Sequence, residues 1–539
     1  MPPETKPVLV IGNGPVGQTS ALFLAHWGVP SIVLDRRPRR DPVGSKAIVQ
    51  QRDVLDAWDT LAGAGREIAE RGLTWQRART FHQDHELFCT EFADSGRSAF
   101  PPFVNLSQSE TEAILDERIA AEPLIDVRWG HEVTGIAQDE TSATVTCATA
   151  GGVAEVAGSY AVACSGARGD AVRQMLGVTL DGRTFGDLFL ICDIRADLGE
   201  WAQERRFYFD PVWNPGRQVL IHPCPDSTFR IDWQVPADFD LEADEASGGL
   251  ERRIRMIVGD TPYEIVWKSV YRFHQRIADR FRVGRVLLAG DAAHLVSPFG
   301  ARGLNSGVQD AENAAWKLAL VWRGLAGDSL LESYHDERHA AAVENLDVTG
   351  ATMDFLVPQD DEHRDRRVAT LTAARTRDEA RALVDSGRLA EPFWYADSPL
   401  TTPAAGRPCG GRPAKGSVPP PAPGVLIPDH PLADGGRLRL LARQSFTLLC
   451  GDEVDVGMVE GAALDGVRPI TVHRLRDLHA DAPGVLGLRP DEVWVVRPDA
   501  HLAATLPVGD PAAIRCAIDR VLGVAGSPAA YRMVSQSQA

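Results

Sequence analysis

Three glycines near the start of the chain have the spacing of a nucleotide-binding turn. Gly12, Gly14 and Gly17 form a GxGxxG pattern directly after the apolar run at 8–11. The first glycine permits a tight turn, the second lets the backbone approach a pyrophosphate, and the third lets the following helix pack on the strand. The N-terminus of that helix would then meet the negative charge. The turn residues expected to contact a cofactor are Gly12, Gly14, Pro15, Val16 and Gly17.

An acidic residue follows at the position that a dinucleotide site requires. Gly28 is expected to end the helix, and residues 31–34 form a second buried strand that ends in Asp35. The Asp35 carboxylate could bind a ribose 2′-hydroxyl, and Arg36 is available for phosphate. A lone GxGxxG is weak evidence, but within a βαβ unit of roughly 30 residues with the acid in place it indicates an ADP-containing cofactor. This unit alone does not separate NAD from FAD.

A second glycine-rich segment, at 284–320, is predicted to form a strand, a loop and a long helix. The helix should begin near the glycine turn and be buried, so that its N-terminal amides and dipole would stabilise negative charge on a bound group. The alternative is a glycine-rich loop that caps an ordinary core helix. The apolar stripe that predicts the helix consists of Val308, Ala311, Ala315, Leu318, Ala319 and Trp322.

The two segments together resemble the FAD motifs of the group A flavoprotein monooxygenases, the aromatic hydroxylases related to para-hydroxybenzoate hydroxylase and phenol hydroxylase. The resemblance covers most of residues 1–360 and implies FAD as the cofactor. It implies that Asp291, which follows Gly290, holds the ribityl chain and that Pro298 lies beside the isoalloxazine ring. Backbone amides around Gly303, Leu304 and Asn305 would face the N1 and O2 edge of the flavin.

Three further stretches carry the same resemblance. In the segment at 45–59, Arg52 would approach the cofactor, and Gln108, within the segment at 105–119, would touch FAD. The segment at 160–178 falls where the family has a Cys-Asp-Gly signature shared between FAD and the nicotinamide donor. His294 belongs by resemblance to the FAD loop, so we expect it to have a structural role.

The chain departs from the family pattern at three positions. Ser165 replaces the usual aspartate of the Cys-Asp-Gly signature, and Gly169 replaces a common serine. Losing a carboxylate changes local hydrogen bonding, so the handling of NAD(P)H is the step most affected. Ala301 stands where the family often has glycine, which is tolerable unless the backbone needs a positive φ.

The motifs predict an α/β chain with a Rossmann-like FAD-binding domain, an inserted β-rich substrate domain and a C-terminal thioredoxin-like domain. Short β-rich runs separated by turns fill the insert and suggest an antiparallel sheet over the flavin. The predicted units are a discontinuous FAD-binding domain at 1–182 and 265–360, a substrate domain at 183–264 with part of 75–104, a helical segment at 361–401, a Pro/Gly-rich linker at 402–424 and the C-terminal domain at 425–539.

The C-terminal region alternates strands with an amphipathic helix, and this order resembles the thioredoxin-like domain of the phenol hydroxylase branch. Strands are expected at 444–451, 470–475, 491–499 and 501–506, and the helix at 511–523. Cys450 and Cys516 stand alone, so no dithiol is available for redox exchange. A structural or subunit-contact role is the preferred interpretation.

The chemistry that the resemblance implies is hydroxylation of a phenolic or related electron-rich aromatic ring. NAD(P)H would reduce FAD, and molecular oxygen (O2) would then form a flavin C4a-hydroperoxide that delivers one oxygen. Because no second GxGxxG follows a strand, the nicotinamide would bind transiently. The alternatives are a flavin oxidase or halogenase of the same fold, an epoxidising or hydroxylating tailoring enzyme of a polyketide-type metabolite, and a flavin-binding protein that is not an enzyme.

Residues that would contact the substrate carry a weaker signal, so the catalytic residues stay unknown from the sequence. Aromatic or titratable side chains can line a flat pocket and bind a phenol, although core packing in a sheet is their more common role. Asp310 and Glu312 are expected on a polar helix face. The weak candidates for the pocket are Tyr208, His222, Trp233 and Tyr271.

Composition fits a large soluble enzyme. The 539 residues carry a formal net charge of −18, which opposes nonspecific nucleic-acid binding, and no apolar run reaches the length of a membrane span. The start of the chain lacks the pattern of a signal peptide. The eight cysteines show no metal or disulfide spacing, so we expect no metal and a cytoplasmic location. The expected partner is a small aromatic substrate, and a homo-oligomer is compatible with the sequence.

Overall fold

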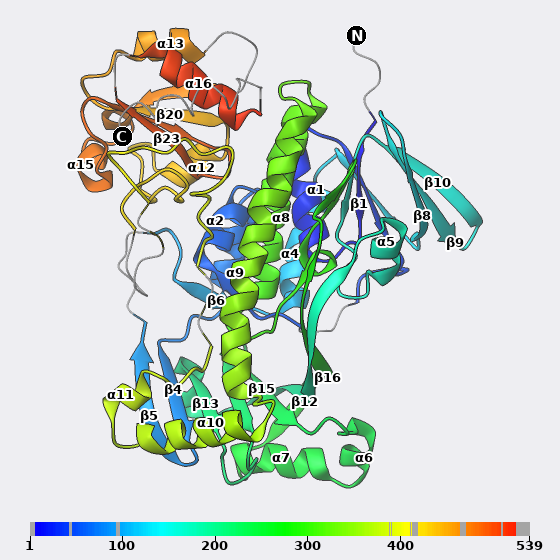
Figure 1. Cartoon of the computed structure of the whole chain (residues 1–539). Helices are drawn as coiled ribbons and strands as arrows, with labels where there is room; N and C mark the ends of the chain where they lie inside the picture. The colour runs from blue at the N-terminus through cyan, green and yellow to red at the C-terminus, as the bar shows by residue number, and fades with distance from the viewer. Residues whose placement is uncertain are drawn as a thin grey trace.

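A computed structural model shows a mixed α/β chain in which two large sheets and a smaller C-terminal unit surround two long helices (Figure 1). The described residues are 6–41, 46–92, 98–387, 389, 391–409, 411, 419–463, 470–507 and 510–523. Parts of the predicted linker and of the C-terminal domain, at 410, 412–418 and 524–539, lie outside them. No helix in the described part of the chain has the length and apolar character needed to cross a membrane.

A six-stranded sheet carries the nucleotide-binding turn. Its order is β17-β18-β11-β1-β2-β7, and every neighbouring pair is parallel except β17 and β18. The carboxyl ends of β1, β2, β11 and β18 therefore meet at one edge, which is where ligands of open α/β sheets bind. The strands are β1 (Val8–Ile11), β2 (Ser31–Asp35), β7 (Ile125–Trp129), β11 (Ala161–Ala163), β17 (Arg282–Val283) and β18 (Val286–Leu288).

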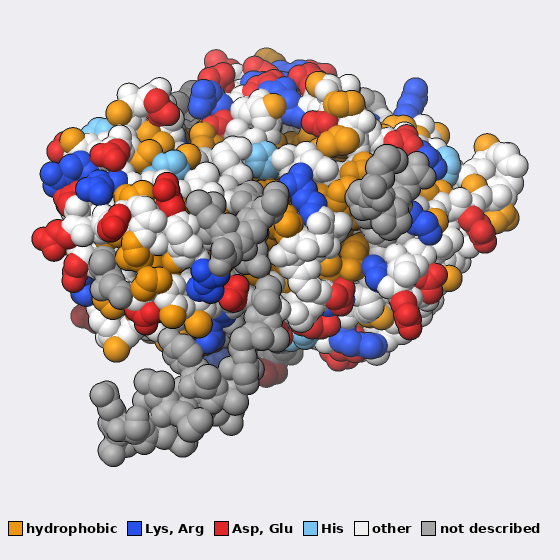
Figure 2. Space-filling model, turned by 90° about the horizontal axis from the view of Figure 1, so that it is seen from above, with side chains coloured by type: hydrophobic (Ala, Val, Ile, Leu, Met, Phe, Trp, Pro, Cys, Tyr) orange, Lys and Arg blue, Asp and Glu red, His pale blue; other side chains and the backbone are white. Residues whose placement is uncertain are grey.

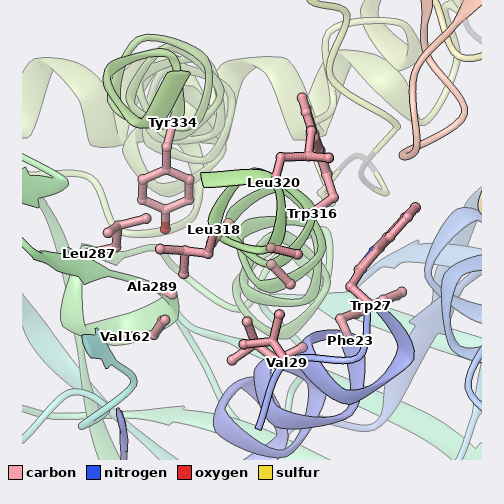
Figure 3. Packing of buried hydrophobic residues seen from close by; sticks show 14 of the residues in the cluster. Phe23, Trp27, Val29, Val162, Leu287, Ala289, Trp316, Leu318, Leu320 and Tyr334 are labelled. Atoms are coloured by element: carbon pink, nitrogen blue, oxygen red, sulfur yellow. The ribbon is translucent and has the colours of Figure 1, made fainter. Parts of the chain in front are cut away.

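The long helix α8 (Arg302–Trp322) runs through the core between α1 (Pro15–His26) and α9 (Glu332–Leu356). Figure 3 shows its apolar side chains between those of α1 on one side and Tyr334 of α9 on the other. The predicted apolar stripe is confirmed as buried except at Trp322, which is only partly buried. Asp310 and Glu312 were expected on a polar face, and this prediction is wrong, because the helix is enclosed by protein on that side too.

The predicted β-rich insert is part of an eight-stranded sheet of order β19-β16-β12-β15-β14-β13-β4-β5. The strands from 77–91 join it through β13, and β13 pairs with β4 in parallel. The expectation of an antiparallel sheet is therefore wrong at this pair and holds at the others. The strands are β4 (Arg77–His82), β5 (His85–Glu91), β12 (Leu180–Ala196), β13 (Glu204–Phe209), β14 (Gln218–Cys224), β15 (Thr228–Val235), β16 (Tyr263–Ala278) and β19 (His294–Leu295).

The two faces of this sheet have different neighbours. One face packs apolar side chains against α6 (Leu241–Ala246) and α7 (Gly249–Val258). The other face packs partly against α9 and α10 (Asp361–Ala374) and partly lines the cavity that the six-stranded sheet also lines. Because side chains alternate along a strand, the position of each residue decides which face it joins.

Shorter elements complete the fold around these sheets. The helical segment predicted at 361–401 is helical only as far as residue 381 among the described residues. The remaining elements are α2 (Arg52–Asp59), α3 (Ala64–Arg71), α4 (Gln108–Ala120), α5 (Asp170–Met175), α10 (Asp361–Ala374), α11 (Asp378–Arg381), β3 (Val49–Gln51), β6 (Phe103–Asn105), β8 (Glu132–Gln138), β9 (Ala143–Thr149) and β10 (Gly152–Gly158), with single 3-10 turns at Gly199–Gln203, Gly290–Ala292 and Asp328–Leu331.

The C-terminal unit forms a four-stranded sheet of order β21-β20-β22-β23, so its four predicted strands and its final helix are confirmed. Buried ion pairs join it to the core, from Arg443 to Glu312 on α8 and from Arg497 to Glu337 on α9. Its elements are β20 (Phe446–Cys450), β21 (Ile470–Arg474), β22 (Glu492–Val496), β23 (Leu502–Pro507), α12 (Leu438–Ala442), α13 (Val456–Ala463), α14 (Leu475–Leu478), α15 (Ala482–Leu486) and α16 (Pro511–Val521).

The net charge of −18 is not gathered into one acidic region on the face seen in Figure 2, where acidic and basic side chains alternate with hydrophobic ones.

Candidate functional site

One large cavity lies along the carboxyl edge of the six-stranded sheet and extends to the eight-stranded sheet. Its volume is about 2340 Å³, whereas pockets for a single small ligand usually hold about 300–1,000 Å³. It is therefore large enough for a dinucleotide and a second molecule. The predicted cofactor residues that line it are Gly12, Gly14, Pro15, Val16, Asp35, Arg36, Arg52, Gln108, Asp291, Pro298, Gly303 and Leu304.

The three glycines of the turn are required for different reasons. A Cβ on Gly12, whose φ is +106°, would lie 2.4 Å from the carbonyl oxygen of Cys164, and a Cβ on Gly17 would lie 1.9 Å from that of Gly12. A Cβ on Gly14 would meet no atom of the described residues within 4 Å. Gly14 is also the N-cap residue of α1, and no side chain accepts a hydrogen bond there. Among the described residues the first backbone amides of the helix are therefore not capped by a side chain. The space at Gly14 and the open helix end fit a pyrophosphate.

Asp35 is engaged by the protein itself. Its Oδ1 accepts hydrogen bonds from the backbone amide and Nε of Arg37, at 2.8 and 3.0 Å, and its Oδ2 accepts from the Asn13 amide and Arg37 Nη2, at 2.8 and 3.0 Å. Burial alone would raise the pKa of Asp35, but these hydrogen bonds lower it. Four donors fill the acceptor sites of a carboxylate, so a ribose hydroxyl would have to displace Arg37. Ribose binding by Asp35 stays a prediction.

Arg37 is a residue that sequence reasoning missed. The sequence favoured Arg36, which lines the cavity but is exposed, whereas Arg37 turns back onto the strand end and pairs with Asp35. Because the two arginines are adjacent, the sequence alone could not show which of them contacts Asp35.

The carboxylate of Asp291 opens into the cavity. The residue is exposed to the cavity, but the protein around it displaces bulk water and raises its pKa, and the nearby charges of His294, Lys46 and Arg173 partly oppose that shift. The described residues give its side-chain oxygens no hydrogen bond, so these oxygens can accept from hydroxyl groups of a ligand. This chemistry fits the predicted contact with a ribityl chain.

The start of α8 lies close to the start of α1. A Cβ on Gly307 would lie 2.6 Å from Cγ2 of Val16 and 3.2 Å from Cα of Gly290, so the two helix N-termini converge on the cavity. Their dipoles both favour negative charge there. Gly290 serves this packing, since a Cβ on it would lie 3.0 Å from Cγ2 of Val16, whereas Gly17 packs against the turn at Gly12. Neither glycine lines the cavity.

Two residues define the loop that precedes α8. Ala301 has φ +57° and ψ 39°, which is the left-handed conformation. The backbone therefore does need a positive φ at this position, where the family often has glycine. Asn305 does not line the cavity, because its side chain accepts from the Gln51 amide at 3.0 Å and donates to the Val49 carbonyl at 2.9 Å. It ties the helix to β3 instead.

His294 lies in a buried polar network behind the cavity. Its Nε2 is 2.7 Å from Oδ2 of Asp310, which also accepts from the Gly290 amide at 2.9 Å, and Oδ1 accepts from Arg338 Nε at 2.6 Å. Burial would raise the pKa of Asp310, but His294 and Arg338 outweigh it and lower the pKa to about 2. This geometry gives His294 the structural role expected of it.

Of the four substrate candidates, two reach the cavity. His222 and Tyr271 line it. Tyr208 and Trp233 do not, because they lie on the opposite face of the sheet in the apolar layer next to α7, in the core-packing role that was expected to be the more common one. Tyr208 stacks on Phe81 there, with ring centroids 4.6 Å apart.

Three polar residues of the same wall were missed. Arg205 on β13 and Arg230 and Asp232 on β15 line the cavity beside His222. Burial raises the pKa of Asp232 to about 7. Burial and the charge of Arg205 lower the pKa of His222 well below its ordinary value. The alternation of polar and apolar residues in the stretch at 228–235 could have indicated a polar wall.

A segment after α11 also lines the cavity and carried no signal in the sequence. Val384, Ser386 and Trp394 are among its lining residues. A Cβ on Gly387 would lie 3.3 Å from Cβ of Phe299, so the segment packs directly on the loop that holds Pro298.

Comparisons with known proteins agree with this geometry. Residues 5–349 match a family model described as an FAD binding domain. The chain is 31% identical over 350 residues to a 3-(3-hydroxy-phenyl)propionate/3-hydroxycinnamic acid hydroxylase of Mycobacterium sp. (strain JLS), a match that covers 63% of this chain and 58% of that protein. It is 30% identical over 356 residues to para-nitrophenol 4-monooxygenase of Pseudomonas sp. (strain WBC-3), covering 65% of this chain and 86% of that protein.

The fold also matches a solved structure along nearly its whole length. The crystal structure of the flavin-dependent monooxygenase PieE, in complex with FAD and substrate, superimposes with a TM-score of 0.82 at 24% identity. The match covers 97% of this chain and 100% of that one. At this identity the likeness concerns the fold.

Proposed function

This chain belongs to the family with an FAD binding domain, and from that membership we propose that it is an FAD-dependent monooxygenase that hydroxylates a phenolic or related electron-rich aromatic substrate. One observation carries the proposal. A single cavity runs from the glycine turn, which fits a pyrophosphate, to a polar wall of the eight-stranded sheet. The redox and oxygen-transfer chemistry would come from FAD, with NAD(P)H as the reductant and molecular oxygen as the oxidant.

Different residues of the cavity would bind different parts of the cofactor. Gly14 and the open N-terminus of α1 would hold the pyrophosphate, Asp291 the ribityl chain, and Pro298 the isoalloxazine ring. The amides of Gly303 and Leu304, at the start of α8, would stabilise negative charge on that ring. Arg52 and Gln108 also line the cavity, which supports their proposed contacts with the cofactor.

The sheet would bind the aromatic substrate and keep water away from the reacting atoms. Phe299 packs against Phe189, Phe207 and Phe273 of this sheet, with ring centroids 5.7, 6.3 and 6.2 Å apart. The loop that holds Pro298 therefore rests on an apolar floor. Phe273 and Phe299 line the cavity, whereas Phe189 and Phe207 are buried and do not. A phenol bound there would have its ring on Phe273 and Phe299 and its hydroxyl near the polar wall.

The finer domain assignment is also a proposal. The eight-stranded sheet would be the inserted substrate domain and the C-terminal unit a thioredoxin-like domain without a dithiol. The strand order β21-β20-β22-β23, with β20 parallel to β21 and antiparallel to β22, supports the second assignment. A cytoplasmic location and a homo-oligomer stay predictions from the sequence.

A tailoring hydroxylase of a larger polycyclic metabolite is the second candidate function. The observation that favours it is the cavity volume of about 2340 Å³, which leaves room beyond a dinucleotide for more than one ring. An oxidase or halogenase of the same fold has no such specific support.

The decisive experiment has two parts. Purified protein should contain extractable FAD, and a screen of simple and polycyclic phenols should find one that stimulates NAD(P)H oxidation and gains one oxygen by mass. Gly14→Val should abolish FAD binding, because its side chain enters space that no atom of the described residues occupies. Gly186→Val is the matched control, since it also meets no atom within 4 Å but is exposed on β12. Protein that cannot be loaded with FAD would refute the proposal.

A further inference from the structure

The polar wall of the cavity is built by three neighbouring strands. Arg205 on β13, His222 on β14, and Arg230 and Asp232 on β15 all line the cavity. In the ladder between β14 and β15, His222 lies opposite Arg230 and Leu220 opposite Asp232. His222 and Asp232 are therefore diagonal neighbours on one face of the sheet, close enough to contact one ligand group.

Two of these side chains have unused hydrogen-bonding capacity. Oδ1 of Asp232 and Nδ1 of His222 are buried and have no hydrogen-bond partner among the described residues. Buried polar atoms are nearly always paired, so unpaired ones call for an explanation. Within the described part of the chain the other oxygen of Asp232 accepts no hydrogen bond either, and Asp232 is only half-buried, on the cavity side.

The two arginines differ in how they are paired. Arg230 is held by Asp193 on β12, with Nε to Oδ1 at 2.8 Å and Nη2 to Oδ2 at 3.2 Å. Arg205 donates to the Ser386 carbonyl at 2.9 Å and lies over the Phe207 ring at 5.3 Å. Within the described ranges Arg205 has no carboxylate at ion-pair distance. Burial lowers its pKa to about 10, so it is still a cation at neutral pH.

The polar wall faces the part of the cavity beside the loop that holds Pro298. Phe207, beneath Arg205, also contacts Phe299, and Pro298 and Phe299 line the same cavity. A substrate ring that packs on Phe273 and Phe299, which both line the cavity, would place a hydroxyl substituent toward the wall.

We propose that Asp232 accepts the proton of the substrate's phenolic hydroxyl and that Arg205 and His222 bind the oxyanion that remains. This inference rests on the proposed hydroxylase function. The O–H bond of the phenol breaks, its electron pair stays on the oxygen, and the proton bonds to a carboxylate oxygen of Asp232. The positive charge of Arg205 then lies beside the phenolate, which donates electron density into the ring and activates it toward an electrophilic oxygen.

The electrostatics of the wall suit a base that works near neutral pH. Burial and Asp193 raise the pKa of Asp232, while Arg230 and Arg205 lower it, and the balance leaves it at about 7. The other titratable groups facing it are His222 and Cys224 on β14. A base with a pKa near the working pH is the most effective proton acceptor. Below about pH 7 the carboxyl is protonated and cannot accept, so the rate should fall there.

The test uses two phenols of different acidity with the FAD-loaded enzyme. For the weakly acidic 3-(3-hydroxyphenyl)propionate, Asp232→Asn should lower kcat by about 100-fold or more and remove the fall in rate below pH 7. For 4-nitrophenol, which is largely ionised at pH 8, the loss should be much smaller because no base is needed. Asp232→Glu, which keeps a carboxylate, should recover part of the rate. Asp238→Asn, the same change at an exposed site, should match the wild type.

The outcomes separate the two proposals. FAD content and thermal midpoint establish that each variant is folded and loaded. Equal losses with both phenols, or an unchanged pH profile in Asp232→Asn, would overturn the role of Asp232 while leaving a working hydroxylase. A wild-type enzyme that hydroxylates no phenol would instead overturn the proposed function.

Discussion

Ser165 and Gly169 are in such close contact that one determines what the other can be. A Cβ placed on Gly169 would lie 2.2 Å from Oγ of Ser165 and 3.2 Å from its Cβ. The two departures from the family pattern are therefore a single packing unit, in which the missing side chain at 169 makes room for the hydroxyl at 165. That hydroxyl is buried and has no hydrogen-bond partner among the described residues.

Gly169→Ser should destabilise the protein by about 1–3 kcal/mol, because overpacking a filled site costs that much. Ser165→Ala removes the atom that is 2.2 Å away and should recover part of the loss. Thermal unfolding of the two single variants and the double variant measures the coupling. Strictly additive changes in stability would mean that the contact between residues 165 and 169 does not cause the loss.

Ser165→Asp should fit, because Ser165 lines the cavity and a longer side chain can extend into it. If the serine limits nicotinamide handling, the variant should speed flavin reduction by NAD(P)H under anaerobic conditions. Stopped-flow absorbance measures the rate, with Ser165→Asn as a control that has similar size and no charge. Equal rates in all three proteins would show that the carboxylate is not needed.

Asp291→Ala should lower FAD occupancy strongly, since its carboxylate opens into the cavity and has no hydrogen-bond partner among the described residues. Bound flavin is measured by absorbance after gel filtration and by titration of the apoprotein. Asp170→Ala, at an exposed carboxylate that also lines the cavity, controls for the loss of charge. Undiminished occupancy in Asp291→Ala would contradict the ribityl contact.

The sequence predicted those parts of the site that are set locally. The turn at Gly12, Gly14 and Gly17 and the strand ending in Asp35 depend on neighbours within one βαβ unit, so their pattern is readable. The position of the second segment was also predicted, because Asp291 and the start of α8 follow a strand with a recognisable loop.

Other parts depend on partners far away in the chain. Tyr208 and Arg205 are three residues apart on one strand and point to opposite faces, and only the pairing with β14 and β4 shows which face is the cavity. The parallel pairing of β13 with β4 and the packing of Gly387 on Phe299 join distant segments. No local pattern encodes such contacts.

The buried Asp310 should make stability depend on pH. Its pKa is about 2 in the folded protein, below the ordinary value of about 3.9 for an unfolded chain. A lowered carboxyl pKa contributes stability above the unfolded pKa, which is lost as the pH falls toward the folded pKa. The contribution is of order 2 kcal/mol.

Asp310→Asn should lack this contribution, so its deficit in unfolding free energy relative to the wild type should shrink between about pH 5 and pH 2. Denaturant unfolding at several pH values measures it. Asp238→Asn, at an exposed carboxyl, should show a constant difference. A deficit for Asp310→Asn that stays constant with pH would mean that the carboxyl is not shifted in the folded protein.

Ala301→Gly should stabilise the protein, contrary to the usual effect of glycine. The left-handed conformation, with φ +57°, costs an alanine about 1–2 kcal/mol. Glycine avoids that cost but loses about 0.5–1 kcal/mol through its more flexible unfolded state, so the net gain should lie between about 0 and about 1.5 kcal/mol. Ala340→Gly, at an exposed position inside α9, should instead destabilise by about 1 kcal/mol. The thermal midpoints of the two variants, measured without FAD, are compared with that of the wild type. A midpoint that falls in Ala301→Gly as it does in Ala340→Gly would contradict strain at Ala301.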